Sequence, residues 1–217
     1  MKFYNSLGPN PRLVRLFTLE RGIELPETIE VDIMTGENRQ PAFVAKNPSG
    51  ELPALELDDG SVLAETVAIC EYLDEKSPGT SLVGATPEER GKTRMWIRRV
   101  ELWITGPATD AFRSAEGAAM FKDRRHLIPQ AADDWKAIAQ EGMARLDADM
   151  AGRDFVAGDR LTLADVVLYA LVDFGVGVGQ SIDAKNANLQ AWFERMAARP
   201  SAEASIHPVA GAGGMRA

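Results

Sequence analysis

The sequence predicts a chain in two parts, a small α/β unit followed by an all-α bundle. The first eighty residues alternate between strand-period and helix-period segments, whereas the later segments carry only helical signals. Between them, residues 77–84 are rich in Ser, Pro, Gly and Thr, which suits a linker. We therefore expect domains at 1–78 and 86–206, with 207–217 as a flexible tail.

The first unit is expected to have the order βαβαββα. Its expected elements are a strand at 2–5, a helix at 11–22, a strand at 28–33, a short helix at 41–46, a hairpin at 53–65 that turns at Asp59-Gly60, and a helix at 66–75. A strand, helix and strand in succession imply a parallel pair, and the hairpin adds two antiparallel strands. A four-stranded mixed sheet follows.

The second unit opens with a helix-start signal. Thr86 is an N-cap candidate, Pro87 takes the first helical position and Glu89 stands at the third, which together form a capping box. Apolar residues then recur at helical spacing from Trp96 onward, and Gly106-Pro107 is expected to kink or end this run.

A second capping box pairs Thr162 with Asp165, and Leu161 and Val166 flank it as a hydrophobic staple. The helix that follows is apolar on nearly all sides, so we expect it to run through the centre of the bundle. Its membrane-like length does not make it a membrane span, because two aspartates interrupt it. Further helices are expected at 130–150 and 187–198.

Composition and charge exclude several classes of function. Residues 1–80 contribute most of the formal charge of −8, since they carry 7 Lys and Arg against 14 Asp and Glu. The sequence has no stripe of basic residues of the kind that binds a nucleic acid. One cysteine, Cys70, allows no intrachain disulfide, and two histidines leave little for a metal site. The start of the chain does not resemble a signal peptide, so we expect a cytoplasmic protein without metal, membrane or nucleic-acid partners.

Three stretches, "NPSGELPAL" (47–55), "LAETVAICEYL" (63–73) and "FVAGDRLTLADVVLYA" (155–170), resemble the cytosolic glutathione transferase (GST) family in order and distance. The resemblance covers nearly the whole chain. It implies an N-terminal thioredoxin-like domain and a C-terminal all-helical GST domain. It also implies glutathione as cosubstrate, a small hydrophobic electrophile as acceptor, a homodimer and a role in detoxification.

The resemblance assigns glutathione-binding roles to Leu52, Pro53, Glu65 and Thr66. A cis bond before Pro53 would turn the backbone of Leu52 toward the cysteinyl part of an extended peptide. Glu65 and Thr66 stand where a helix begins, so they suit the charged ends of the γ-glutamyl group. The alternatives are that Pro53 is trans and opens an ordinary strand, and that Thr66 only caps its helix.

The loop before the expected short helix offers polar side chains for the glycyl carboxylate of glutathione. The candidates are Asn38, Arg39 and Gln40, of which we favour Asn38 and Gln40, although each also suits a solvated loop.

The stretch "GPNPR" (8–12) holds the candidate catalytic residue, Asn10. GSTs place the side chain that activates the thiol at the end of the first strand or the start of the first helix. The position used by serine-type enzymes falls on Gly8, whereas the position of the cysteine type falls on Asn10, as in the bacterial Nu-like, asparagine-type group. Tyr4 and Ser6 are weaker candidates, and Asn10 is alternatively the N-cap of the helix.

The resemblance leaves the chemistry open. Thiolate attack on an electrophile is the favoured reaction, and disulfide reduction or cleavage of an ether or halide are alternatives. A noncatalytic binding module on the same fold is a further alternative, because a fold does not determine a function. We expect Cys70 to be a core residue, and Trp96 and Trp103 to pack in the core rather than line an acceptor pocket.

Overall fold

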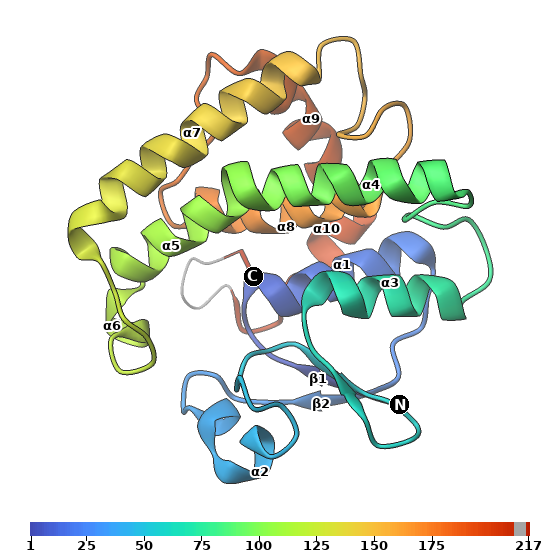
Figure 1. Cartoon of the computed structure of the whole chain (residues 1–217), viewed down its shortest axis with the longest axis vertical. Coiled ribbons are helices and arrows are strands. Elements are labelled where there is room, and N and C mark those ends of the chain that lie inside the picture. The colour runs from blue at the N-terminus through green and yellow to red at the C-terminus, as the bar shows by residue number, and fades with distance from the viewer. Residues whose placement is uncertain (211–215) are drawn as a thin grey trace.

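The computed structural model describes residues 1–210 and 216–217, and it has the expected two-part architecture (Figure 1). The first part is thioredoxin-like, with a four-stranded mixed sheet in the order β2-β1-β3-β4. β1 (Lys2–Asn5) pairs in parallel with β2 (Glu27–Glu30) and antiparallel with β3 (Ala54–Glu56), which pairs antiparallel with β4 (Val62–Leu63). The predicted βαβαββα order is confirmed.

Helices cover both faces of this sheet. α1 (Pro9–Arg21) and α3 (Thr66–Lys76) lie on the face toward the helical part, whereas α2 (Pro41–Val44) lies on the opposite face (Figure 1). α1 begins two residues earlier than predicted, because a proline is tolerated at the first helical position. It ends at Gly22, whose φ of 63° is left-handed and favours glycine.

β2 is shorter and begins earlier than the predicted strand at 28–33. The Val31 N–H still donates to the Asn5 carbonyl, so the backbone pairing continues one residue beyond the strand. The chain then turns through Asp32, whose carboxylate accepts hydrogen bonds from the Met34 and Thr35 amides. The turn ends the predicted alternation early and brings Ile33 toward the second part of the chain.

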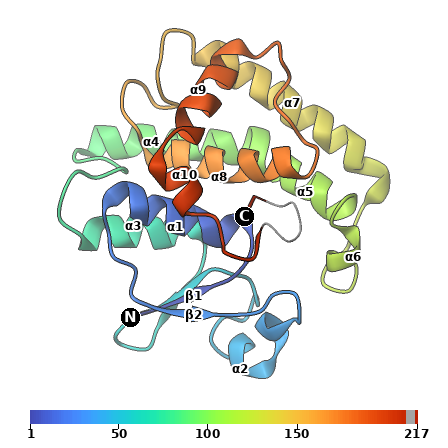
Figure 2. The ribbon, with the colours of Figure 1, turned by 180° about the vertical axis from the view of Figure 1, so that it is seen from behind.

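The second part is all-helical, as predicted. Its elements are α4 (Pro87–Val100), a π-helical segment (Glu101–Thr105), α5 (Gly106–Ser114), α6 (Ala118–Phe121), a 3₁₀ turn (Pro129–Ala131), α7 (Ala132–Asp149), α8 (Leu163–Gly177), α9 (Ala187–Ala197) and α10 (Pro200–Ala204). α8 is buried on nearly all sides, and the other long helices pack around it (Figures 1 and 2). No helix in the described residues is long and apolar enough to cross a membrane.

The Gly106-Pro107 pair does not end the helical run, but the helix is distorted there, as the alternative of a kink expected. Pro107 has no amide hydrogen, and the preceding turn widens to a π-helix in which the Gly106 N–H bonds to the Glu101 carbonyl. A Cβ on Gly106 would lie 2.7 Å from that carbonyl oxygen, so only glycine fits there. The run therefore continues as α5, so of the two expected outcomes only an end at the proline is wrong.

Both predicted capping boxes are present, at Thr86 with Glu89 and at Thr162 with Asp165. The second is buried more deeply. The Asp165 carboxylate accepts hydrogen bonds from the Thr162 amide and hydroxyl at 2.9 Å, from the Val156 amide at 2.8 Å and from the Trp192 indole at 3.0 Å. This box therefore fixes the start of α8 and also connects it to α9.

Buried ion pairs join the two parts of the chain. Arg12 of α1 is fully buried and lies 2.6 Å from Asp173 of α8. Glu20, also on α1, accepts hydrogen bonds from Nε and Nη2 of Arg199, both at 2.6 Å. Burial works against ionisation of Glu20, but the hydrogen bonds from Arg199 and Ser201 outweigh it and lower its pKa. The orientation of α1 against the helical part is thus fixed at two points.

The segment 207–217, expected to be a flexible tail, falls partly on residues 211–215, which lie outside the described residues. Its described ends make defined contacts. The His207 amide donates to the Ala217 carbonyl at 2.8 Å, and Arg216 Nε lies 3.0 Å from a carboxylate oxygen of Asp173.

Candidate functional site

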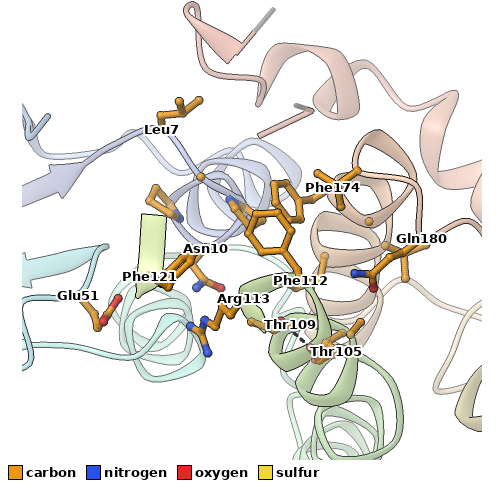
Figure 3. A pocket seen from close by; sticks show the side chains of 18 of the residues that line it. Leu7, Asn10, Glu51, Thr105, Thr109, Phe112, Arg113, Phe121, Phe174 and Gln180 are labelled. Carbon is orange, nitrogen blue, oxygen red and sulfur yellow. Dashed lines mark hydrogen bonds between the residues drawn. The ribbon is translucent and has the colours of Figure 1, made fainter. Parts of the chain in front are cut away.

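A deep cleft separates the N-terminal end of α1 from the facing ends of α5 and α8 (Figure 3). It encloses about 920 Å³ of empty space, part of it open to solvent. Its first-domain wall consists of Leu7, Gly8, Pro9, Asn10, Pro11, Ile33, Glu51 and Leu52. Residues of both parts of the chain therefore line one cleft, whose helical wall is described below.

The start of α1 leaves one side chain and one amide directed at this cleft. Gly8 is the N-cap and makes no side-chain cap, and Pro9 and Pro11 carry no amide hydrogen. Asn10 is the second residue of the helix, so the alternative that it is the N-cap is wrong. Its half-buried side chain lines the cleft and has no hydrogen-bond partner among the described residues.

The competing side chains of the first strand are engaged elsewhere. The Tyr4 hydroxyl donates to Glu56 at 2.6 Å, and burial, followed by this hydrogen bond, raises its pKa. The Ser6 hydroxyl is buried and donates to the Val31 carbonyl at 2.7 Å. Neither residue lines the cleft. Of the candidates that the sequence offered, only Asn10 presents a polar side chain to the cleft.

The Leu52-Pro53 peptide bond is cis, so the alternative of a trans proline is wrong. Leu52 lines the cleft, and Pro53 lies behind it at the start of β3. Within the described part of the chain, the N–H and C=O of Leu52 make no hydrogen bond. A free donor and acceptor on one residue are what an extended peptide needs in order to pair with it.

Glu65 and Thr66 stand at the start of α3. Glu65 is the N-cap and Thr66 the first helical residue, and no side chain caps this end, so Thr66 does not have the capping role that the alternative gave it. Glu65 is exposed and has a φ of 68°, a strained conformation that costs about 1–3 kcal/mol in a non-glycine residue. Its carboxylate and the open amides of the helix suit the amino and carboxyl groups of an amino acid.

The candidates of the β2–α2 loop do not line the cleft. Asn38 is fully buried, and its amide donates to the Gly50 carbonyl at 2.6 Å, so its side chain supports the loop that carries Glu51 and Leu52. Arg39 binds the Ser49 carbonyl and the Glu51 carboxylate. Gln40 is exposed at the start of α2, which leaves it free to contact a ligand.

The helical wall of the cleft was not identified from the sequence. It consists of Ile104, Thr105, Ala108, Thr109, Phe112, Arg113, Phe121, Arg124, Met143, Leu171, Val172, Phe174, Gly175, Val178 and Gln180. Phe112 packs edge-to-face on Phe121, with centroids 6.2 Å apart, and on Phe174, at 4.9 Å. The signal was present in positions 105, 108, 109, 112 and 113, which share one helical face, but all except 105 lie beyond Pro107, where we expected a kink or an end.

The other residues considered from the sequence lie outside the cleft. Trp96 and Trp103 pack within the helical part, and the Arg99 guanidinium stacks on both rings. Cys70 is fully buried in the core, and burial raises its pKa well above the usual value. The expectation that these residues serve packing is confirmed. No group of three His, Cys, Asp or Glu within the described residues is suited to hold a metal ion.

Comparison with known proteins agrees with this layout. Residues 8–76 match the family described as glutathione S-transferase, N-terminal domain, and residues 129–200 match glutathione S-transferase, C-terminal domain. Glutathione S-transferase 2 of Saccharomyces cerevisiae is 32% identical over 200 residues, which cover 89% of this chain and 84% of that protein.

Two solved structures have the same fold. A glutathione S-transferase domain-containing protein from Marinobacter aquaeolei VT8 is 38% identical, with a TM-score of 0.87 over 93% of this chain and 99% of that one. Gtt2 from Saccharomyces cerevisiae is 32% identical, with a TM-score of 0.85 over 95% of this chain and 100% of that one. The chain therefore belongs to the glutathione S-transferase family, a family of enzymes that use glutathione as cosubstrate.

Proposed function

We propose that this enzyme ionises the thiol of glutathione at the start of α1, with Asn10 as the side-chain donor, for attack on a hydrophobic electrophile in the cleft. One observation carries the proposal. Among Tyr4, Ser6, Gly8 and Asn10, only Asn10 brings a polar side chain without an internal partner to the wall of the cleft.

Two local donors supply the energy that this role requires. Lowering a thiol pKa by roughly two units from about 8.5 requires about 2.7 kcal/mol. A hydrogen bond from the Asn10 amide to a thiolate contributes about 1.5–3 kcal/mol, because the acceptor is charged. The α1 N-terminus adds up to about 1 kcal/mol, through the one free amide hydrogen of its first turn. An amide group is therefore sufficient without a hydroxyl.

The remaining contacts hold glutathione in an extended conformation. We assign its cysteinyl backbone to Leu52, which Pro53 orients, and its γ-glutamyl group to Glu65 and Thr66. Gln40 is the better of the loop candidates for the glycyl carboxylate, because Asn38 is fully buried. The first eighty residues carry 7 basic against 14 acidic side chains, so contacts at short range must outweigh an unfavourable field, which salt screens over about 10 Å.

The favoured reaction is a substitution. The thiol proton passes to solvent, the thiolate sulfur forms a bond to the electrophilic carbon, and the leaving group departs with the bonding electron pair. Phe112, Phe121 and Phe174 give the acceptor an apolar aromatic surface. Assays with a haloarene, a disulfide and an aryl ether would rank conjugation against disulfide reduction and ether cleavage.

Several finer assignments accompany this proposal. We place the glutathione-binding domain at 1–78 and the helical domain at 86–206, and we assign the enzyme to the bacterial, Nu-like, asparagine-type group. A homodimer in the cytoplasm with a detoxifying role follows from the family resemblance. A mass that stays monomeric at all concentrations would refute the dimer.

The substitution Asn10→Ala tests the central step, with Asn188→Ala, on an exposed asparagine of α9, as control. Loss of one hydrogen bond to a charged sulfur predicts a fall in kcat of about tenfold to 150-fold toward a haloarene. Retention on immobilised glutathione should persist, because the contacts of Leu52 and Glu65 remain. If turnover is unchanged and only thermal stability falls, Asn10 has a structural role and the mechanism is wrong. Absence of glutathione binding by the unmodified protein would instead favour a noncatalytic module.

A further inference from the structure

Two arginines, Arg113 and Arg124, are the charged residues of the helical wall, whose other members are apolar or uncharged. Arg113 comes from the last turn of α5, and Arg124 follows α6. In Figure 3 the Arg113 side chain extends from α5 beside Asn10, toward the side of the cleft that carries Glu51. The Arg113 guanidinium therefore lies where an acceptor substrate would approach the activated sulfur, and Arg124 lines the same cleft.

The carboxylates near these arginines neutralise them only in part. Glu51 lies 2.7 Å from Arg39, a partner outside the cleft. Asp110 lies 3.7 Å from Arg113, and its side chain is 52% exposed, so this pair is long and solvated. Arg124 Nη2 donates to the Ile33 carbonyl at 3.4 Å and forms no ion pair within the described residues. The cleft thus carries a net positive charge, although the first domain is acidic.

Arg113 is also substantially removed from water. Its side chain is 23% exposed, and its guanidinium stacks on Phe121 at 5.6 Å from the ring centroid. Burial, followed by the repulsion of Arg125, lowers its pKa, and the attraction of Glu51 and Asp110 offsets only part of this shift. The contact with the Phe121 ring offsets only part of the cost of burying this cation, so a bound anion would recover more of it.

We propose that the acceptor site selects aromatic electrophiles that carry a carboxylate, with the ring against the apolar surface formed by Phe112 and Phe174 and the carboxylate on Arg113 and Arg124. This inference rests on the proposed function, because it assigns the substrate class of the same cleft. It differs from a role in glutathione binding, since both arginines belong to the α5–α6 wall and Leu52, Glu65 and Thr66 belong to the first domain.

A matched pair of acceptors tests this assignment. A chlorodinitrobenzoate and its chlorodinitrobenzamide share ring and leaving group and differ in charge. The ratio of kcat/KM for benzoate over benzamide is measured in the unmodified enzyme, in Arg113→Gln and in Arg124→Gln. Comparison of this ratio between variants cancels the intrinsic reactivity of the two compounds. Arg98→Gln is the control, because Arg98 is 68% exposed on α4 outside the cleft.

We expect each cleft substitution to lower the ratio about tenfold or more, the loss of one charge-assisted hydrogen bond, and Arg98→Gln to leave it unchanged. Arg113→Lys, which keeps the charge, should recover part of the selectivity. A ratio unchanged in both glutamine variants would overturn the proposal. A rise in the KM for glutathione with an unchanged ratio would also overturn it, and would assign the arginines to glutathione.

A binding measurement separates this inference from the proposed chemistry. Fluorescence titration with anilinonaphthalene sulfonate and with the uncharged phenylnaphthylamine reports on the cleft without any turnover. We expect Arg113→Gln and Arg124→Gln to weaken the anionic dye about tenfold and leave the neutral dye unchanged. An equal effect on both dyes, or none on either, would contradict the anionic site. An enzyme inactive toward both acceptors but with this dye preference would refute only the proposed reaction.

Discussion

The buried carboxylate of Asp165 provides a stability prediction whose size follows from its contacts. In Asp165→Ala, four hydrogen bonds lose their acceptor: those from the Thr162 amide and hydroxyl, the Val156 amide and the Trp192 indole. The hydroxyl can rotate to another partner, but the three N–H groups cannot, and Val156 and Trp192 are fully buried. At about 1–3 kcal/mol for each unsatisfied buried donor, the loss is at least about 3 kcal/mol.

Part of that loss is offset by relief of a buried charge. Burial raises the pKa of Asp165 despite its hydrogen bonds, so the carboxylate itself is held at a cost. We therefore expect a net loss of about 3 kcal/mol for Asp165→Ala. Asp165→Asn should lose less stability, because its carbonyl oxygen still accepts hydrogen bonds. Its NH2 group, however, faces the donors that bonded to the other carboxylate oxygen.

Urea unfolding followed by tryptophan fluorescence measures this loss, since Trp192 is a direct partner of the carboxylate. Asp159→Ala, on an exposed aspartate of the same loop, is the matched control and should change stability by less than about 0.5 kcal/mol. A loss below about 1 kcal/mol for Asp165→Ala would refute the reasoning. It would mean that the box orders the start of α8 without stabilising it.

Three further predictions concern the contacts between the parts and the lone cysteine. The Glu20 pKa is lowered in the folded protein, so its pair with Arg199 stabilises the fold fully above the ordinary pKa of 4.5, and this stability is lost as pH falls through the folded pKa. Glu20→Gln should therefore reduce the dependence of the free energy of unfolding on pH in this range. An unchanged dependence would contradict this assignment. Arg12→Met should cost about 3 kcal/mol in urea unfolding, because Asp173 stays buried with only a partly exposed partner; unchanged stability would show that the pair contributes nothing. Cys70 should resist a thiol reagent until the protein unfolds, since it is fully buried and its pKa is raised; rapid native labelling would refute that.

The local patterns of the sequence predicted the elements that local chemistry determines. The two capping boxes and the hairpin at Asp59-Gly60 depend on residues a few positions apart, so their signals are complete in the sequence. The choice between a kink and an end of the helical run at Pro107 was not predictable in this way. It depends on a π-helical turn that only the packed structure reveals.

In the candidate site too, the residues set by local motifs were predictable, whereas those set by packing were not. The position of Asn10 and the exposed start of α3 at Glu65 followed from motifs with fixed spacing. The burial of Asn38 did not, because its partner is the carbonyl of Gly50, twelve residues away across a loop. The placement of Arg113 in the cleft depends on how α5 packs against the first domain, which no local spacing records.

The claim on which the account depends is that the first domain keeps a bound thiol ionised near neutral pH. Titration of the ultraviolet thiolate absorbance of glutathione at saturating protein tests it directly. The account predicts a bound thiol pKa about two units below the free value of about 8.5. A bound thiol that titrates as it does in free solution would contradict it.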